Sequence, residues 1–183
     1  MKYWIRLLTL FLGVILIFTA IELLLPRSYS ISTSQTMNVP ADRIYQQIEG
    51  LPSWKAWSQW NPDRIKNLTI DYGADGKSQS WTDVRGDGKL WFTGQTENQR
   101  VDYQMRFANF PEMSSSIVLK EDNGKTTVSW TSEGVLPTRP LYGVFRHIYV
   151  NEMTNQYKLS LQRLQEVAET PPVAEAKPNP DAD

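Results

Sequence analysis

A series of short segments in which apolar and polar residues alternate most constrains how this chain can fold. Six such segments follow one another between residues 65 and 134, separated by turn-forming sequences such as Gly73–Gly76, Gly86–Gly88 and Asp122–Gly124. A period of two is typical of strands with one buried face. Short turns rich in Gly, Asp and Asn join antiparallel neighbours. The sequence therefore predicts an antiparallel meander with one covered face.

Further segments complete an α+β fold. Residues 27–39 alternate as a first strand, which brings the expected sheet to about seven strands, and residues 40–48 are typical of a short helix. Residues 141–169 form a long amphipathic pattern. Its apolar positions recur at helical spacing: Met153, Tyr157, Leu161, Leu164 and Ala168, joined by Ser160. We expect this helix to lie across the apolar face of a curved sheet.

Residues 51–62 hold three of the seven tryptophans of the chain, Trp54, Trp57 and Trp60. Their spacing of three places them near one face of a short helix, which Pro52 and Pro62 bracket. We expect at least one of these rings to pack as a structural element under the long helix. On that prediction, Trp54→Ala lowers stability by about 3 kcal/mol if the ring is buried.

The N-terminus predicts a membrane anchor over residues 1–27. Lys2 and Arg6 precede an apolar run from Leu7 to Leu25. As a helix that run is about 28 Å long, close to one hydrocarbon core. The basic flank favours a cytoplasmic N-terminus, with the following domain on the extracytoplasmic side. A cleaved signal peptide is the alternative, although the run is long and no small-x-small cleavage site follows it.

Composition excludes several kinds of function. The chain has no cysteine and one histidine, His147, so thiol chemistry and a metal cluster with more than one histidine ligand from one chain are excluded. The formal net charge of -1 gives no reason to expect nucleic acid as a partner. We predict no metal site and no cofactor, and the sequence identifies no protein partner. Residues 169–183, rich in proline, alanine and acidic residues, are expected to be a disordered tail.

The order of elements and three local motifs resemble the START-like, polyketide cyclase/dehydrase-like (SRPBCC) superfamily. The segment 51–62 is similar to its tryptophan-rich segment after the first helix, and 125–130 to its penultimate G-x-T-x-V-x-W strand. The segment 159–164 is similar to its G-L-x-x-L helix end, with Ser160 where glycine is common. The resemblance covers roughly residues 28–167. It implies a helix-grip fold, with a cavity between sheet and helix for an apolar small molecule.

Seven residues are candidates for contact with such a ligand, because the predicted strands and helix bring large apolar and aromatic groups together: Trp81, Trp91, Tyr103, Met105, Trp130, Met153 and Tyr157. An ordinary filled core is the competing interpretation. We predict a membrane-anchored domain that binds an apolar or amphipathic small molecule or lipid. The alternatives are a ligand-free interaction module of the cell envelope and a cyclase- or hydrolase-type enzyme. In that enzyme, Glu152 or Tyr157 would do acid–base work; no catalytic residue is assigned.

Overall fold

A computed structural model describes residues 2–137 and 142–170. Helix α1 (Lys2–Leu24) leads into strand β1 (Ser28–Met37), followed by α2 (Ala41–Ile48), the 3-10 turn η1 (Leu51–Ser53) and α3 (Trp54–Trp57). The next strands are β2 (Thr69–Tyr72), β3 (Ser78–Thr82), β4 (Gly88–Thr96), β5 (Arg100–Phe107), β6 (Met113–Asp122) and β7 (Lys125–Val135). Helix α4 (Tyr142–Glu169) follows. The α+β class that the sequence predicts is confirmed.

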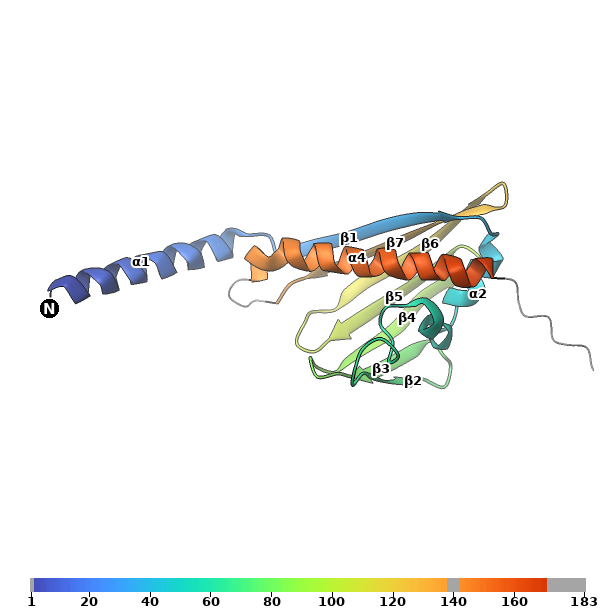
Figure 1. Ribbon diagram of the computed structural model, residues 1–183, viewed down its shortest axis with the longest axis horizontal. Helices are drawn as coiled ribbons and strands as arrows, with labels where there is room; N and C mark the ends of the chain where they lie inside the picture. Colours follow the sequence, from blue (N-terminus) through green and yellow to red (C-terminus); the bar gives the residue numbers. More distant parts are fainter. Residues whose placement is uncertain (1, 138–141, 171–183) are drawn as a thin grey trace, which may run out of the picture.

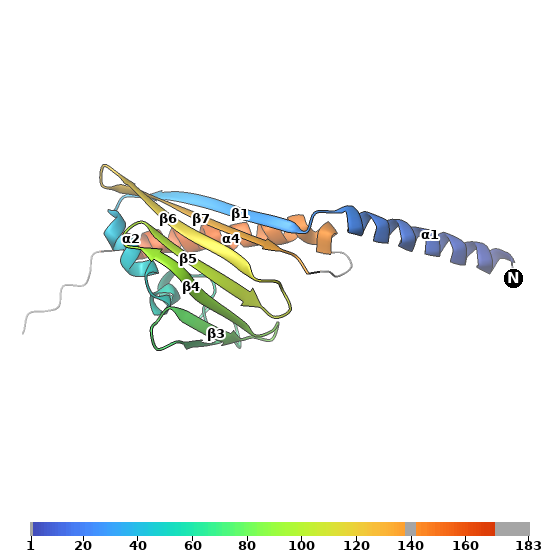
Figure 2. The same cartoon turned by 180° about the vertical axis from the view of Figure 1, so that it is seen from behind.

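Within the described residues, seven strands form one antiparallel sheet in the order β1-β7-β6-β5-β4-β3-β2. Strands β2 to β7 are the predicted meander. Strand β1 joins the sheet at the far edge, beside β7, with Ser28 opposite Val135 and Met37 opposite Thr126. The chain thus returns to its first strand before it enters α4, and α4 lies along one face of the sheet (Figures 1 and 2).

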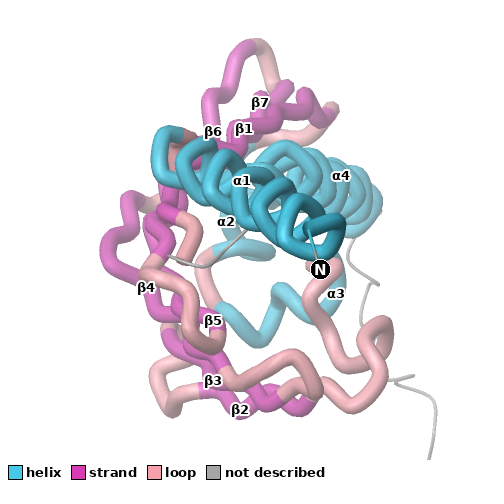
Figure 3. Tube along the Cα trace, turned by 90° about the vertical axis from the view of Figure 1, so that its left-hand side faces the viewer, coloured by secondary structure: helices cyan, strands magenta, loops and turns pink. Residues whose placement is uncertain are grey.

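The sheet is strongly curved. Seen end-on, it runs from β1, β7 and β6 through β5 and β4 to β3 and β2, and the curve partly surrounds the short helices (Figure 3). A register shift between Phe92 and Gly94 on β4 interrupts the pairing with β5. Bulges of this kind bend the strand that carries them and increase local twist. The curvature leaves space between β3–β5 and α4, which the segment after α3 enters.

The predicted burial faces agree with the structure. Ile117 and Leu119 on β6 face inward, as do Val128 and Trp130 on β7. The apolar face of α4 is buried from Tyr157 to Ala168, whereas Met153 is half-buried. A ten-residue strand that alternates buried and exposed positions, as β6 does at its start, is the direct result of packing one face against a helix.

Two of the wrongly predicted boundaries affect the packing. Residues 65–68 were expected to begin a strand, but β2 starts at Thr69 because Asn67 has a positive φ of 63° that a strand excludes. Trp60 was expected on one helical face with Trp54 and Trp57, but α3 ends at Trp57 and Ser58 has extended backbone. Trp60 therefore points along a different direction and packs on Trp81 and Phe107.

Trp54 and Trp57 are buried, with 6% and 0% of their surface exposed, and their helix packs on α4. The indole Nε1–H of Trp54 donates to the carbonyl oxygen of Ile48 at 3.1 Å, and that of Trp57 donates to Gln47 at 2.9 Å. Both rings are thus fixed to α2 as well as to the core. The structural role expected for this segment is confirmed.

Helix α1 projects from the domain at the end where α4 begins (Figure 1). Its span Lys2–Ile21 is long and apolar enough to cross a membrane, and the window is not buried inside the domain. A membrane anchor and a signal sequence share these properties. Residues 171–183, nearly all of the predicted tail, and Leu141, the expected first helical residue, lie outside the described residues. Glu169, assigned to the tail, ends α4.

Candidate functional site

A cavity of about 570 Å³ lies between the sheet, α4 and the segment that follows α3. Its wall is mainly apolar and aromatic. The sheet contributes Tyr29, Tyr72, Gln79, Trp81, Leu90, Tyr103, Met105, Phe107, Met113 and Trp130, with Phe110 and Pro111 from the β5–β6 loop. The helix contributes Tyr149, Glu152, Met153, Gln156, Tyr157 and Ser160. This volume lies within the range of about 300–1,000 Å³ that small-molecule sites occupy.

Six of the seven residues predicted to contact a ligand line this cavity. They are Trp81, Tyr103, Met105, Trp130, Met153 and Tyr157. Trp91 does not, because side chains alternate along β4 and the neighbouring Leu90 is the one that faces inward. The ammonium group of Lys89 lies 5.8 Å from the Trp91 ring centroid. The structure therefore places Trp91 outside the predicted group.

Stacked aromatic rings form the inner end of the cavity. The rings of Trp130 and Tyr157 are parallel within 11° and their centroids are 4.0 Å apart. Trp54 packs edge-on against Tyr103 at 5.3 Å and against Trp130 at 6.2 Å. Each of these rings comes from a different element, so the contacts tie β5, β7, α3 and α4 together. Interlocked aromatic contacts make this end a rigid wall.

A buried chain of hydroxyl groups runs beneath that wall. The Ser115 and Ser132 Oγ atoms are 2.6 Å apart, and Ser132 Oγ lies 2.8 Å from the Tyr157 hydroxyl. Trp130 Nε1 donates to the Tyr103 hydroxyl at 2.9 Å. Burial raises the pKa of both Tyr103 and Tyr157 above the ordinary value. Both phenols are therefore neutral hydrogen-bonding groups at physiological pH, and neither is suited to act as a base.

Two further indole rings, those of Trp60 and Trp81, line the cavity. Trp60 and Trp81 pack edge to face with centroids 5.5 Å apart, and the Trp81 ring lies over Gly88, where a Cβ atom would come within 2.1 Å of Trp81 Cζ2. Both Nε1 atoms are buried without a hydrogen-bond partner among the described residues. Arg85 lies above Trp60, with its Cζ 5.0 Å from the ring centroid. Arg85 is also paired with Asp83.

Sequence reasoning missed several lining residues. Trp54 and Trp60 were assigned to structure rather than to the cavity, and Tyr29, Tyr149 and Phe110 were not singled out. Tyr29 and Tyr149 meet edge-on at 5.1 Å, so β1 and α4 close one end together. The inward parity of Tyr29 on β1 was available from the sequence. The approach of Phe110 to Tyr149, at 6.2 Å, depends on the curvature of the sheet.

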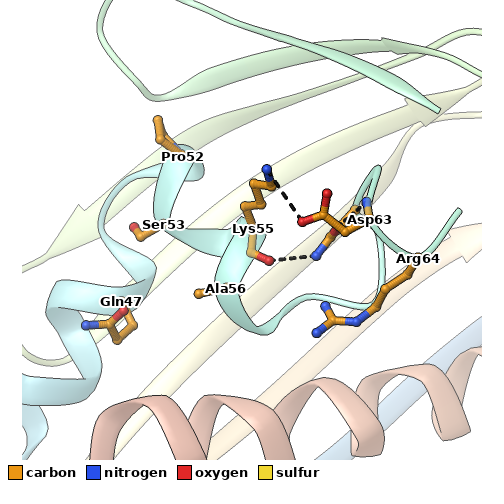
Figure 4. Close-up of a pocket in the computed structure, with 8 residues that line it drawn as sticks. Gln47, Pro52, Ser53, Lys55, Ala56, Asp63 and Arg64 are labelled. Atoms are coloured by element: carbon orange, nitrogen blue, oxygen red, sulfur yellow. Dashed lines mark hydrogen bonds and ion pairs between the residues drawn. The ribbon is translucent and has the colours of Figure 1, made fainter. Parts of the chain in front are cut away.

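A second depression, of about 640 Å³, lies on the outer side of the tryptophan-rich segment (Figure 4). It is lined by Gln47, Pro52, Ser53, Lys55, Ala56, Asn61, Asp63 and Arg64. Lys55 and Asp63 form an ion pair at 3.5 Å across it, and Asn61 donates to the Lys55 carbonyl at 2.6 Å. Because this depression is open and polar, it lacks the apolar enclosure that a small molecule needs to leave water.

Groups suited to acid–base chemistry are sparse around the main cavity. Glu152, one residue considered for catalysis, lies on the exposed side of its wall and accepts a hydrogen bond from Gln156 at 2.7 Å. His147 is exposed on α4. In the described residues, no cluster of three or more His, Asp or Glu side chains could hold a metal ion. The arrangement suits binding of an apolar body with a few polar contacts.

Comparison with solved structures gives the fold. A protein of unknown function from Staphylococcus aureus is 10% identical, with a TM-score of 0.63 over 79% of this chain and 95% of that one. A protein from Thermus thermophilus is 15% identical, with a TM-score of 0.59 over 76% and 97%. The Aha1 dimer from Colwellia psychrerythraea is 18% identical, with a TM-score of 0.55 over 77% and 96%.

At these identities the likeness shows a shared fold, the helix-grip arrangement that the sequence motifs implied. No family model matches the sequence. No curated protein matches it either.

Proposed function

We propose that this chain is a membrane-anchored helix-grip domain that binds an apolar or amphipathic small molecule between its sheet and α4. The observation on which the proposal chiefly rests is the cavity of about 570 Å³ with an aromatic wall. Small-molecule sites are typically about 300–1,000 Å³ and mainly apolar, with few polar groups. Trp81, Tyr103, Met105, Trp130, Met153 and Tyr157 are the proposed contacts, joined by Trp54 and Trp60.

The anchor is part of the same proposal. Helix α1 would cross the membrane with its N-terminus in the cytoplasm, because Lys2 and Arg6 lie on the short N-terminal side. Residues 28–168 would then form the binding domain on the extracytoplasmic side. Near the start of α4, Arg146 Nε donates to the Ser28 carbonyl at 2.7 Å, so the first strand and the first turns of the long helix are linked beside the anchor. This arrangement would keep the cavity close to the bilayer.

Catalysis is less well supported than binding. The Tyr157 hydroxyl is held neutral by burial, which raises its pKa well above the ordinary value, and it is engaged with Ser132. Glu152 lies on the exposed side of the wall. General acid–base work requires a group whose pKa is near the operating pH and whose position is fixed beside the reacting atom. Neither group meets both conditions.

The test is a titration of the full chain, purified in a neutral detergent, with the uncharged apolar fluorophore N-phenyl-1-naphthylamine. We expect saturable fluorescence with one site per chain. Met153→Trp should abolish it, since Met153 lines the cavity and a larger side chain fills it. Leu159→Trp is the matched control, because Leu159 lies on the exposed side of α4. Equal binding by both variants would rule out this cavity as the site.

A further inference from the structure

Two arginine side chains, Arg64 and Arg163, lie where the segment after α3 meets α4. Arg64 lines the cavity wall and also the outer depression, so it stands between the two. Its guanidinium reaches toward α4 in Figure 4. Arg163 lies on α4, one turn beyond Ser160, which also lines the cavity. Arg163 is not part of the cavity lining, but it lies near enough to Arg64 to lower the pKa of that guanidinium, so two arginines from distant parts of the sequence come close together beside the cavity wall.

The loop that carries Arg64 is held in a fixed position. The Gln59 backbone N–H donates to Ser160 Oγ at 3.0 Å, which fastens the loop directly to α4. Arg64 Nη1 donates to the Ser58 carbonyl at 2.9 Å, and the Trp60 N–H donates to Ser58 Oγ at 3.1 Å. One face of the Arg64 guanidinium group is thus oriented by the backbone, which leaves its other N–H donors for a further acceptor.

Neither arginine has a carboxylate partner among the described residues, since the ion pairs found there involve Lys55, Arg85 and Arg100. Arg163 Nη1 is buried without any hydrogen-bond partner in the same residues. Arg64 is an exposed residue, but partial desolvation and the neighbouring Arg163 lower its pKa, while Asp63 opposes them. Asp63 is itself paired with Lys55 at 3.5 Å. A buried guanidinium donor without an acceptor is unfavourable, and an oxyanion bound beside Arg163 would satisfy it.

We infer that Arg64 and Arg163 bind the anionic head of an amphiphile, a carboxylate or phosphate group, whose apolar part occupies the cavity. The inference rests on the proposed function and makes the ligand class more specific. Guanidinium groups bind such oxyanions through paired N–H···O bonds. The apolar wall begins beside Arg64, with Trp60 and Ile65 on the same loop. The arginines can therefore bind the anionic group of a molecule whose apolar part lies in the cavity.

The test compares two probes that quench tryptophan fluorescence, 11-bromoundecanoate and 11-bromo-1-undecanol, on the full chain in neutral detergent micelles. We expect the acid to bind about tenfold more tightly than the alcohol, the usual range for a charge-assisted hydrogen bond. Arg163→Gln and Arg64→Gln should each remove most of that preference and leave the affinity for the alcohol within about twofold. Arg106→Gln, at an exposed position on β5, is the control and should change neither.

The outcomes separate the two proposals. Equal affinity for acid and alcohol, or a preference that survives both substitutions, overturns the head-group inference while saturable alcohol binding upholds the cavity. If neither probe binds, the proposed function itself fails. Inorganic phosphate that displaces the acid as effectively as unlabelled undecanoate would show a site for free oxyanions and overturn the amphiphile. If a glutamine variant does not fold, Arg163→Lys keeps the charge without the paired geometry and should reduce the preference by a smaller factor.

Discussion

Removal of the Tyr157 hydroxyl tests how the buried hydroxyl chain contributes to stability. In Tyr157→Phe the ring remains, and with it the parallel stack on Trp130 at 4.0 Å. The bond of 2.8 Å to Ser132 Oγ is lost. Ser132 keeps its partner Ser115 at 2.6 Å, and the Tyr103 hydroxyl, which also neighbours Tyr157, keeps the Trp130 Nε1–H donor at 2.9 Å. The substitution therefore removes chiefly one neutral hydrogen bond, the one to Ser132.

The expected loss in the free energy of unfolding is about 1 kcal/mol, the net value of such a bond. For a domain of this size that lowers the melting temperature by about 2–4 °C. At a urea slope of about 2 kcal/mol/M, it lowers the midpoint by about 0.5 M. Tyr157→Leu should lose about 1 kcal/mol more, because the ring stack is lost as well.

Urea unfolding of the full chain in detergent, followed by tryptophan fluorescence, measures these values. Tyr72→Phe is the control, since Tyr72 lies on the edge strand β2 with 38% of its surface exposed. It should be close to neutral. An unchanged midpoint for Tyr157→Phe would show that the hydroxyl makes no net contribution. A loss above about 3 kcal/mol would show that Ser132 and Ser115 do not remain satisfied by each other.

Three further predictions follow from the same packing. Burial raises the folded-state pKa of Tyr103 and Tyr157 above the value of 10.0, so their contribution to stability is complete below pH 10 and is lost as the pH rises further. The urea midpoint should therefore fall between pH 8 and pH 11, and it should fall less steeply in Tyr157→Phe. A midpoint that does not change with pH would contradict this. Gly88→Ala places a Cβ 2.1 Å from Trp81 Cζ2 and should lower the free energy of unfolding by about 1–3 kcal/mol, measured by thermal unfolding. In the control Gly50→Ala, the nearest atom to the new Cβ is 3.9 Å away, and the loss should be less than about 1 kcal/mol. Equal losses in the two variants would argue against the close contact at Gly88. Ser160→Ala removes the acceptor for Gln59 N–H and should speed limited proteolysis within residues 58–65; unchanged cleavage would mean that this bond does not hold the loop.

The sheet and the long helix were predictable because burial imposes a regular period on both. In β6 the alternation that buries Ile117 and Leu119 is visible in the sequence, and in α4 so is the spacing from Tyr157 to Ala168. The pairing of β1 with β7 was not predictable from period alone, because the two strands are joined by distant contacts rather than by a turn. Strand β2 began late because a single residue, Asn67, adopts positive φ.

The candidate site was only partly predictable. Side chains alternate between the two faces of a strand, and some of the residues are brought together from distant parts of the sequence. Trp91 was chosen by residue type, although its neighbours Leu90 and Phe92 are the ones that face the core. The ring centroids of Phe92 and Trp54 are 5.9 Å apart. Two adjacent aromatic residues on a strand point to opposite faces, so one of them had to lie outside. Arg64 comes near Arg163 through the fold, since the loop after α3 is fastened to α4 by the bond from Gln59 N–H to Ser160. No local pattern indicates such a contact.

The central claim is that the cavity between sheet and α4 holds an apolar molecule. Native mass spectrometry of the full chain, purified in detergent from its own membranes and released from the micelle, tests it most directly. We expect a bound adduct of one apolar or amphipathic molecule per chain, absent from Met153→Trp and present in Leu159→Trp. A bare chain in all three samples, with no adduct after addition of apolar probes, would show that the cavity is an unfilled packing defect.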